Sequence, residues 1–314
     1  MPDAHFIVIG DLKSPDDEAM AFLEDVHDCR YYTYAQQEAL GYECSPLIGS
    51  GSIQRRNVGF LEALKSKAEF ILSVDDDNIP LQASYGTDIE KAFAFTSGIE
   101  IIGKNRWHDH GQHLRPQAKH RGFPYGIKPD VKYNGVANPK IGVAAGTCIL
   151  DPDVDAITRL AYAPDVQDVS ILAEAGYVVN PYTWTVFNSQ ATAVRREFVP
   201  AWFLWNHAGR LDDIFASLIV QRVMRDRGYY VHFGKPFAAQ DRNEHSLIGD
   251  LKAELVGYEN TQQLANVLDK IQLPNKSVID DCRRIWETLD HIDFVDPRTV
   301  ETANAFLNDV EKVL

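Results

Sequence analysis

Three consecutive carboxylates, Asp75, Asp76 and Asp77, are the residues whose type and spacing point most clearly to chemistry. They follow the apolar run of residues 70–74, which predicts a buried strand. Side chains alternate between faces along a strand, so Asp75 and Asp77 are expected to leave its end on the same side. Carboxylates held this close repel each other unless a cation lies between them, and hard oxygen ligands suit Mg²⁺ or Mn²⁺. An acidic turn capped by Asn78 is the alternative interpretation.

The segment before this strand predicts a helix that carries cations in its first turns. Ser52 is a suitable N-cap for a helix over residues 53–64, and Arg55, Arg56 and Asn57 follow at once. Positive charge at a helix N-terminus opposes the helix dipole. We therefore expect these side chains to hold a phosphate or a base, with a solvated basic face as the alternative.

Further along the chain, charged side chains recur beside turns and strand ends. Arg121 and Lys128 flank a rigid aromatic turn that would suit a phosphate or sugar clamp. Asp153 and Asp155 follow a predicted strand over residues 141–150. These carboxylates are candidates for moving protons in a reaction.

Two other polar stretches allow more than one interpretation. Asp212 and Asp213 open a long amphipathic helix, where they could act in catalysis or could cap the helix and complement its dipole. The stretch with His108, His110 and His113 suggests a zinc site, but no cysteine or second cluster supports it. A mobile surface loop is the favoured interpretation of that stretch.

Length and composition describe an ordinary globular chain. It has 314 residues, of which 45% are hydrophobic and 24% charged, and it contains no apolar run that approaches a membrane-spanning helix. No signal-peptide pattern is present, and the four cysteines lack metal-site or disulfide spacing, so we expect a reduced cytoplasmic location. The net charge of −14 argues against nucleic acid or an anionic membrane as partner.

Strands and helices alternate over the first hundred residues. This predicts an α/β fold with a mostly parallel sheet, helices on both faces and a ligand site beyond the carboxyl ends of the strands. Residues 5–10 read as a buried strand that ends at Gly10, and residues 183–194 alternate like another strand. We expect a catalytic domain over residues 1–249 and a helical C-terminal extension over residues 250–314 that packs against it.

Asp75-Asp76-Asp77 resembles the DxD motif of GT-A glycosyltransferases. Over roughly residues 50–245 the chain also resembles the plant reversibly glycosylated polypeptides, which are UDP-arabinopyranose mutases. The N-terminus is similar to STELLO-type glycosyltransferase-like proteins, and the whole resembles the GDP-galactopyranose mutases of nucleoside-antibiotic pathways. The segments that carry the likeness to the mutases are the aspartate triplet, residues 121–128, 152–156, 195–198 and 210–213.

The resemblance implies a GT-A-like, Rossmann-like fold and a metal-dependent, flavin-free enzyme that acts on a nucleotide-diphosphate sugar. Arg121 falls where the family carries the arginine linked to reversible self-glycosylation. Lys128 replaces a second arginine and loses its bidentate fork. Gln240 stands where the family has a histidine, which puts the third metal ligand in doubt, and His245 is a substitute candidate.

The predicted site has three sets of residues. Candidate catalytic residues are Arg121, Lys128, Asp153, Asp155, Asp212 and Asp213. Candidate substrate-binding residues are Gly10, Asp11, Lys13, Arg55, Arg56, Asn57, Asp76 and Trp107. Candidate ligands for Mn²⁺ or Mg²⁺ are Asp75, Asp77 and His245.

Three functions remain open from the sequence. The first is a pyranose–furanose mutase of a UDP- or GDP-linked sugar, and the second is a glycosyltransferase that uses a separate acceptor. The third is a non-catalytic nucleotide-sugar-binding protein, since fold-level likeness does not fix function. In the mutase, Arg121 either carries the sugar covalently or clamps the diphosphate. A homo-oligomer is compatible with each function.

Overall fold

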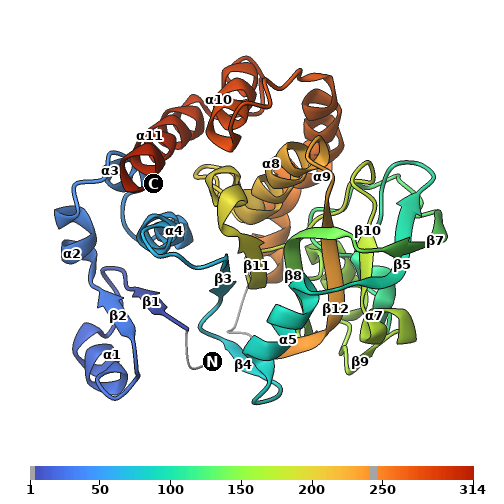
Figure 1. The fold of residues 1–314 in the computed structure, drawn as a ribbon, viewed down its shortest axis with the longest axis horizontal. Coiled ribbons are helices and arrows are strands. Elements are labelled where there is room, and N and C mark those ends of the chain that lie inside the picture. The colour runs from blue at the N-terminus through green and yellow to red at the C-terminus, as the bar shows by residue number, and fades with distance from the viewer. Residues whose placement is uncertain (1–3, 241–245) are drawn as a thin grey trace.

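The structure is a computed structural model that describes residues 4–240 and 246–314. Its centre is an eight-stranded sheet in the order β3-β11-β8-β12-β10-β5-β7, with β4 paired to β12 (Figure 1). The strands of this sheet are β3 (Phe70–Val74), β4 (Asn78–Pro80), β5 (Ser97–Gly103), β7 (Val131–Ala137), β8 (Lys140–Leu150), β10 (Tyr177–Val179), β11 (Ala191–Arg195) and β12 (Tyr229–Gln240). Two short pairs lie outside it, formed by β1 (Phe6–Ile9) with β2 (Cys29–Tyr32), and by β6 (Leu114–Arg115) with β9 (Asp168–Val169).

The central sheet is mixed, so the expectation of a mostly parallel sheet is wrong. Strand β12 runs parallel to β8, and β10 runs parallel to β5. The pairings β3–β11, β11–β8, β10–β12, β5–β7 and β4–β12 are antiparallel. Strand direction depends on how each later segment returns to the sheet, and a strand–helix alternation limited to the first hundred residues does not determine it.

Helices cover both faces of the sheet, as predicted. On β8, Val143 and Ala145 join the core cluster that includes α8 (Asp212–Arg225), whereas Ala144 joins the cluster that includes α5 (Tyr85–Phe93). Neighbouring residues of a strand point to opposite faces, so a nearly continuous apolar run is needed when both faces are covered.

Shorter helices surround this core. They are α1 (Asp16–Leu23), α2 (Tyr34–Ala39), α3 (Cys44–Ile48), α4 (Arg56–Leu64), α6 (Ala156–Tyr162) and α7 (Ile171–Ala175), with 3₁₀ turns η1 (Ile53–Arg55), η2 (His110–His113), η3 (Arg196–Ala201) and η4 (Gly209–Leu211). The predicted helix over residues 53–64 is therefore present as η1 followed by α4. The predicted strand over residues 183–194 is shorter, since only its last part forms β11.

The C-terminal helices are α9 (Leu247–Lys270), α10 (Val278–Leu289) and α11 (Pro297–Val313). They form an arc along one side of the molecule that brings α11 against α3 and α4 (Figure 1). The Asp309 carboxylate accepts hydrogen bonds from the backbone N–H groups of Glu43 at 3.0 Å and Cys44 at 2.9 Å. The predicted domain boundary after residue 249 falls inside α9. Among the described residues, no helix is both long and apolar enough to cross a membrane.

Candidate functional site

Asp75 lies directly beyond the last residue of β3, where the sequence placed it. Its backbone N–H donates to the carbonyl oxygen of Gln190 at 3.0 Å, which continues the pairing between β3 and β11. Its carboxylate Oδ1 accepts from Arg56 Nη2 at 2.6 Å. Burial raises the pKa of Asp75, and the nearby charges of Asp213 and Asp77 add to that rise, while Arg56 opposes it.

Asp77 lies in the same turn and presents one oxygen without a partner. Its Oδ2 accepts from Gln240 Nε2 at 2.9 Å, whereas its Oδ1 is buried and has no hydrogen-bond partner among the described residues. Asp76, between the two, is exposed. A buried carboxylate oxygen without a donor is costly unless a cation or another donor reaches it. The alternation expected at the strand end therefore separates Asp76 from its two neighbours.

Arg121 is held between two carboxylates. Its Nε and Nη2 donate to Asp153 at 2.6 and 2.8 Å, and Nη2 also donates to Asp213 Oδ1 at 3.0 Å. The Arg121 and Asp153 side chains are only 8% and 9% exposed. Burial opposes the charge on Arg121, but Asp153 and Asp213 outweigh it and hold the arginine pKa well above its ordinary value. The pKa of Asp153 is lowered because Arg121 outweighs burial.

An irregular segment before β11 ties these two groups together. The backbone N–H of Ser189 donates to Asp213 Oδ2 at 2.9 Å, and Asn188 Nδ2 donates to Asp153 Oδ2 at 3.0 Å. On the other side, Arg56 Nη1 donates to Ser189 Oγ at 2.8 Å. A regular strand would alternate these side chains between faces, so the irregular backbone is what lets consecutive residues serve one cluster.

Asp212 is the first residue of α8 and differs from its neighbour Asp213. Its Oδ2 accepts from Gln54 Nε2 at 3.0 Å. Burial and the charge of Asp213 raise the pKa of Asp212 to about 7, with Arg121 acting against the rise. A carboxyl group with such a pKa can both accept and release a proton near neutral pH.

We call this set of residues the carboxylate cluster. Its members are Gln54, Arg56, Asp75, Asp77, Arg121, Asp153, Asn188, Ser189, Asp212, Asp213 and Gln240. The sequence singled out the charged members, but it did not assign Gln54, Asn188 or Ser189 to the site. Uncharged side chains of this kind carry no local pattern that distinguishes them from ordinary loop residues.

The donor set fits a divalent cation held by two protein carboxylates. Asp75 and Asp77 offer hard oxygen atoms, and the unpartnered Oδ1 of Asp77 marks a place for a positive charge. Mg²⁺ is commonly held by one or two carboxylates together with water and substrate phosphate oxygens. Within residues 4–240 and 246–314, no three His, Cys, Asp or Glu side chains form a group that could hold a metal by themselves. His245 lies outside the described residues.

The structure places Arg56, and not Arg55, beside the carboxylates. Arg55 is buried and donates to Gln37 Oε1 at 2.9 Å and Glu38 Oε1 at 3.1 Å, which ties η1 to α2. Asn57 exchanges hydrogen bonds at 2.9 Å with the backbone of Leu204. Arg55 and Asn57 therefore have structural partners. The expectation that side chains at this helix start hold a phosphate or a base stays a prediction.

The predicted N-terminal binding residues lie in a separate group. Gly10 accepts from Gln37 Nε2 at 2.6 Å through its carbonyl oxygen, and Asp11 Oδ2 accepts from the backbone of Ser52 at 2.9 Å. Backbone hydrogen bonds, among them that of Ser52, lower the pKa of Asp11 even though burial, the largest influence, acts against them. Lys13 is exposed. These contacts fix the turn after β1, and Ser52 in turn contacts Gln54 of the carboxylate cluster.

Three further predicted residues are also placed apart from it. Asp155 is the N-cap of α6, where it accepts from the backbone of Thr158 at 3.0 Å. Trp107 is buried and packs its ring against Phe123, with ring centroids 5.8 Å apart. Lys128 is exposed on the surface. Trp107 therefore supports the segment that carries Arg121, and Asp155 has the capping role that aspartate commonly takes.

The histidine-rich stretch is buried, so the favoured interpretation as a mobile surface loop is wrong. His108 Nε2 and His110 Nδ1 lie 3.0 and 2.9 Å from the hydroxyl oxygen of Tyr177, and His113 Nδ1 lies 2.9 Å from Ser170 Oγ. Burial lowers the pKa of His113 to about 4. Each of the three imidazole rings has a hydroxyl partner at one nitrogen, which explains how these rings are accommodated in a core. His108 Nδ1 has no partner among the described residues.

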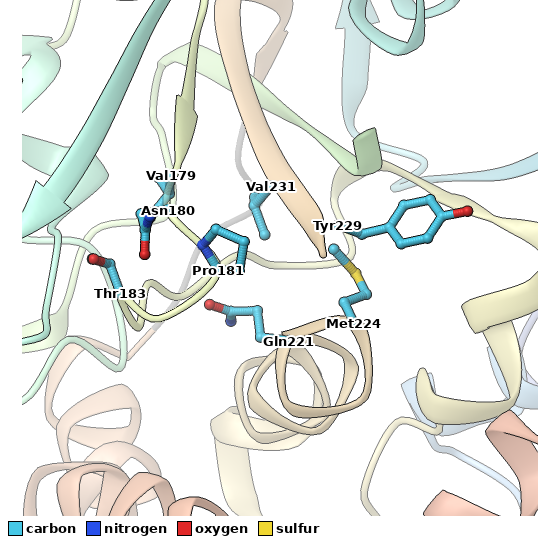
Figure 2. A pocket seen from close by; sticks show the side chains of 8 residues that line it. All are labelled: Val179, Asn180, Pro181, Thr183, Gln221, Met224, Tyr229 and Val231. Carbon is cyan, nitrogen blue, oxygen red and sulfur yellow. The ribbon is translucent and has the colours of Figure 1, made fainter. Parts of the chain in front are cut away.

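Two cavities lie elsewhere. A void of about 10 Å³ is lined by side chains such as Val179, Val231 and Gln221. Figure 2 shows these residues where β10, β12 and α8 meet. The void has room for about one water molecule. A groove of about 220 Å³ is lined by residues of β1, β2 and α4, including Tyr32, Glu62 and Lys65. Neither lining includes a member of the carboxylate cluster.

Comparison with models of protein families finds no match for this chain, and comparison with curated proteins finds none either.

Proposed function

We propose that this protein is a metal-dependent, flavin-independent mutase that interconverts the pyranose and furanose forms of a UDP- or GDP-linked sugar. One observation carries the proposal. Arg56 and Ser189 connect Asp75, which pairs with Asp77 as a metal-suited carboxylate, to Asp213. The adjacent residue Asp212 has a pKa raised to about 7. Such a site can bind the diphosphate, and next to it lies a group that can transfer a proton on the sugar.

The diphosphate must leave the anomeric carbon and remain close enough to return. A divalent cation on Asp75 and Asp77 would supply positive charge to the departing diphosphate. Arg56 adds a second positive group beside Asp75 and can donate to a phosphate oxygen. Charge that is already in place lowers the barrier because nothing has to reorganise as the bond breaks.

Exchange of the ring oxygen requires one proton to move. When the bond between the anomeric carbon and the diphosphate breaks, the sugar becomes an oxocarbenium ion. The 4-hydroxyl oxygen then attacks that carbon and gives its proton to a base, and the former ring oxygen leaves the carbon and takes the proton back. The diphosphate rejoins to give the furanose form. Asp212, with a pKa raised to about 7 by burial and Asp213, is suited to this exchange.

The protonation of Arg121 supports a clamping role. A guanidinium has no lone pair to offer while it is protonated, and Asp153 and Asp213 stabilise the protonated form. Its Nε and Nη2 groups already donate to Asp153 and Asp213, so contact with a ligand next to Asp212 would fall to Nη1. We assign Arg121 to holding the ligand rather than to forming a bond with the sugar.

The test is incubation of the purified protein with Mn²⁺ and a panel of UDP- and GDP-linked pyranoses, followed by NMR of the products. The proposal expects a furanose isomer of at least one substrate and loss of that product in chelator-treated protein. Release of free nucleotide that depends on an added acceptor would instead identify a glycosyltransferase. Binding without any turnover would identify a nucleotide-sugar-binding protein.

A further inference from the structure

Asp212 and Asp213 are neighbours in sequence, but their carboxylates have different surroundings. Asp213 accepts from Arg121 Nη2 at 3.0 Å and from Ser189 N at 2.9 Å, and Ser189 Oγ lies 3.2 Å from it. Among the described residues, the Asp212 carboxylate in contrast accepts a side-chain hydrogen bond from Gln54. Asp213 therefore accepts from both Arg121 and Ser189, whereas the side-chain donor to Asp212 is the amide of Gln54.

The orientation of that amide is itself fixed. Gln54 Oε1 lies within hydrogen-bonding distance of Ser52 Oγ. An amide oxygen can only accept, so the Ser52 hydroxyl donates to it. The amide nitrogen must then face the other way, toward Asp212 Oδ2, which it reaches at 3.0 Å. Ser52 thus selects which end of the Gln54 side chain meets the carboxyl group.

The short turn η1 allows this arrangement. Gln54 lies in η1, and Arg56 begins α4 immediately after it. Residues two apart on a helical turn point in different directions. Gln54 consequently reaches the start of α8, while Arg56 reaches Asp75 at the end of β3.

We propose that Gln54 is a positioning residue, oriented by Ser52, that holds Asp212 in place as the proton carrier of the site. It acts through Asp212 and does not touch the reacting atoms. The inference rests on the proposed function where it predicts a change in the pH dependence of kcat. Its physical content, which is that Gln54 stabilises the ionised form of Asp212, can be measured without any substrate.

An N–H donor favours the ionised form of a carboxyl group, whereas burial favours the neutral form. Removing the donor therefore takes away one influence that favours the ionised form, and Asp212 becomes a weaker acid. Arg121, Arg56 and the backbone N–H of Asp213 still act against burial and the Asp213 charge. A hydrogen bond to a charged group corresponds to a shift of about one pH unit or somewhat more. The base form of Asp212 would then be scarce at neutral pH.

The test compares Gln54→Met, which keeps the length of the side chain without its donor, with Ser52→Ala, which frees the amide to rotate. Gln117→Met is the matched control, because it makes the same replacement at an exposed residue. Titration of Asp212 is followed in the complete, substrate-free protein by isotope-edited infrared spectroscopy, with Asp212→Asn to identify its signal. In parallel, the acidic limb of kcat is measured with UDP-arabinopyranose and Mn²⁺.

The inference expects the Asp212 titration to move up by about one pH unit in Gln54→Met, by less in Ser52→Ala, and not in Gln117→Met. Where turnover is present, the acidic limb of kcat moves in parallel. An unchanged titration in both Gln54→Met and Ser52→Ala overturns the inference, and so does an unmoved kinetic limb. If the titration shifts while no nucleotide sugar is converted, the inference stands and the proposed mutase function fails. If Gln54→Met does not fold, Ser52→Ala decides alone.

Discussion

Arg121 and Asp153 form a two-point ion pair across 32 residues of sequence, with donor–acceptor distances of 2.6 and 2.8 Å. Both side chains are largely withdrawn from solvent. The planar guanidinium matches the two carboxylate oxygens, so the pair fixes the orientation of the guanidinium plane and the position of its charge. This pairing orients Arg121 so that the same group also reaches Asp213.

Asp153→Asn is therefore expected to destabilise the fold strongly. The substitution leaves the buried Arg121 charge with a single carboxylate partner, Asp213. Removal of one partner from a buried ion pair typically costs about 3–5 kcal/mol. Urea denaturation at neutral pH measures the free energy of unfolding, and Asp28→Asn, which breaks a more exposed pair with His5, is the control. Equal stability of the two variants would show that the Arg121 pair contributes little.

Metal affinity is expected to depend on Asp77 and not on Asp76. Asp77 offers a buried oxygen that has no partner within residues 4–240 and 246–314, whereas Asp76 is exposed. Asp77→Asn removes the charge and should weaken Mn²⁺ binding by at least about tenfold, because hard cations depend on anionic oxygen ligands. Calorimetric titration of Mn²⁺ with a nucleoside diphosphate present gives the affinities. Equal loss in Asp76→Asn and Asp77→Asn would contradict the assignment of the ligands.

Activity is expected to fall as the pH decreases through about 7. Asp212 must be ionised to take a proton from the sugar, and burial together with Asp213 raises its pKa to about 7. Below that value the neutral acid dominates, so kcat should decrease about tenfold per pH unit. Asp212→Asn should remove both the pH limb and nearly all turnover. A wild-type kcat that stays constant between about pH 5.5 and about pH 8 would show that another group carries the proton.

Stability is expected to fall on acidification because imidazole rings are buried in the neutral form. Burial, with help from Arg115, lowers the pKa of His113 to about 4, so the unfolded chain binds a proton between the ordinary value of 6.5 and about 4 while the folded chain does not. Stability from this group is therefore intact above pH 6.5 and lost below it, by about 3 kcal/mol in total. Asp109, whose pKa burial raises to about 6, acts in the opposite direction over part of this range.

His113→Asn tests this account, because an asparagine oxygen can replace Nδ1 as the partner of Ser170. The variant should be about 1 kcal/mol less stable at pH 7.5 yet lose less stability than the wild type between pH 6.5 and 4.5. Urea denaturation across that pH range provides both numbers. A parallel loss in wild type and variant would assign the acid sensitivity to other groups.

The sequence predicted the residues near the cluster better than the sheet that positions them. The strand over residues 70–74 and its terminal aspartates carry a local pattern, since an apolar run stops at charged residues. Strand β11 was harder to place, because its antiparallel pairing with β3 and β8 joins segments far apart in the chain. Local alternation contains no information on that direction.

The sequence singled out the charged members of the carboxylate cluster, together with charged residues that lie outside it, and it missed neutral members such as Gln54. Asp212 and Asp213 looked equally suited to capping and to catalysis, and only burial beside Arg121 distinguishes them from ordinary capping residues. Asp155 has the same sequence signature, yet the structure gives it the cap of α6. Gln54 joins the cluster through a hydrogen bond to Asp212, which lies 158 residues further along the chain. The residues next to Gln54 in the sequence do not indicate this contact.

The central claim is that the bond between the anomeric carbon and the diphosphate breaks and re-forms within one site. Positional isotope exchange measures this directly, with a nucleotide pyranose that carries ¹⁸O in the bridge between sugar and phosphate, in the presence of Mn²⁺. The account predicts a furanose product in which the label is spread over the bridging and non-bridging oxygens of the terminal phosphate, with no release of free nucleotide. A label that remains in the bridge, or nucleotide set free without a furanose product, would contradict it.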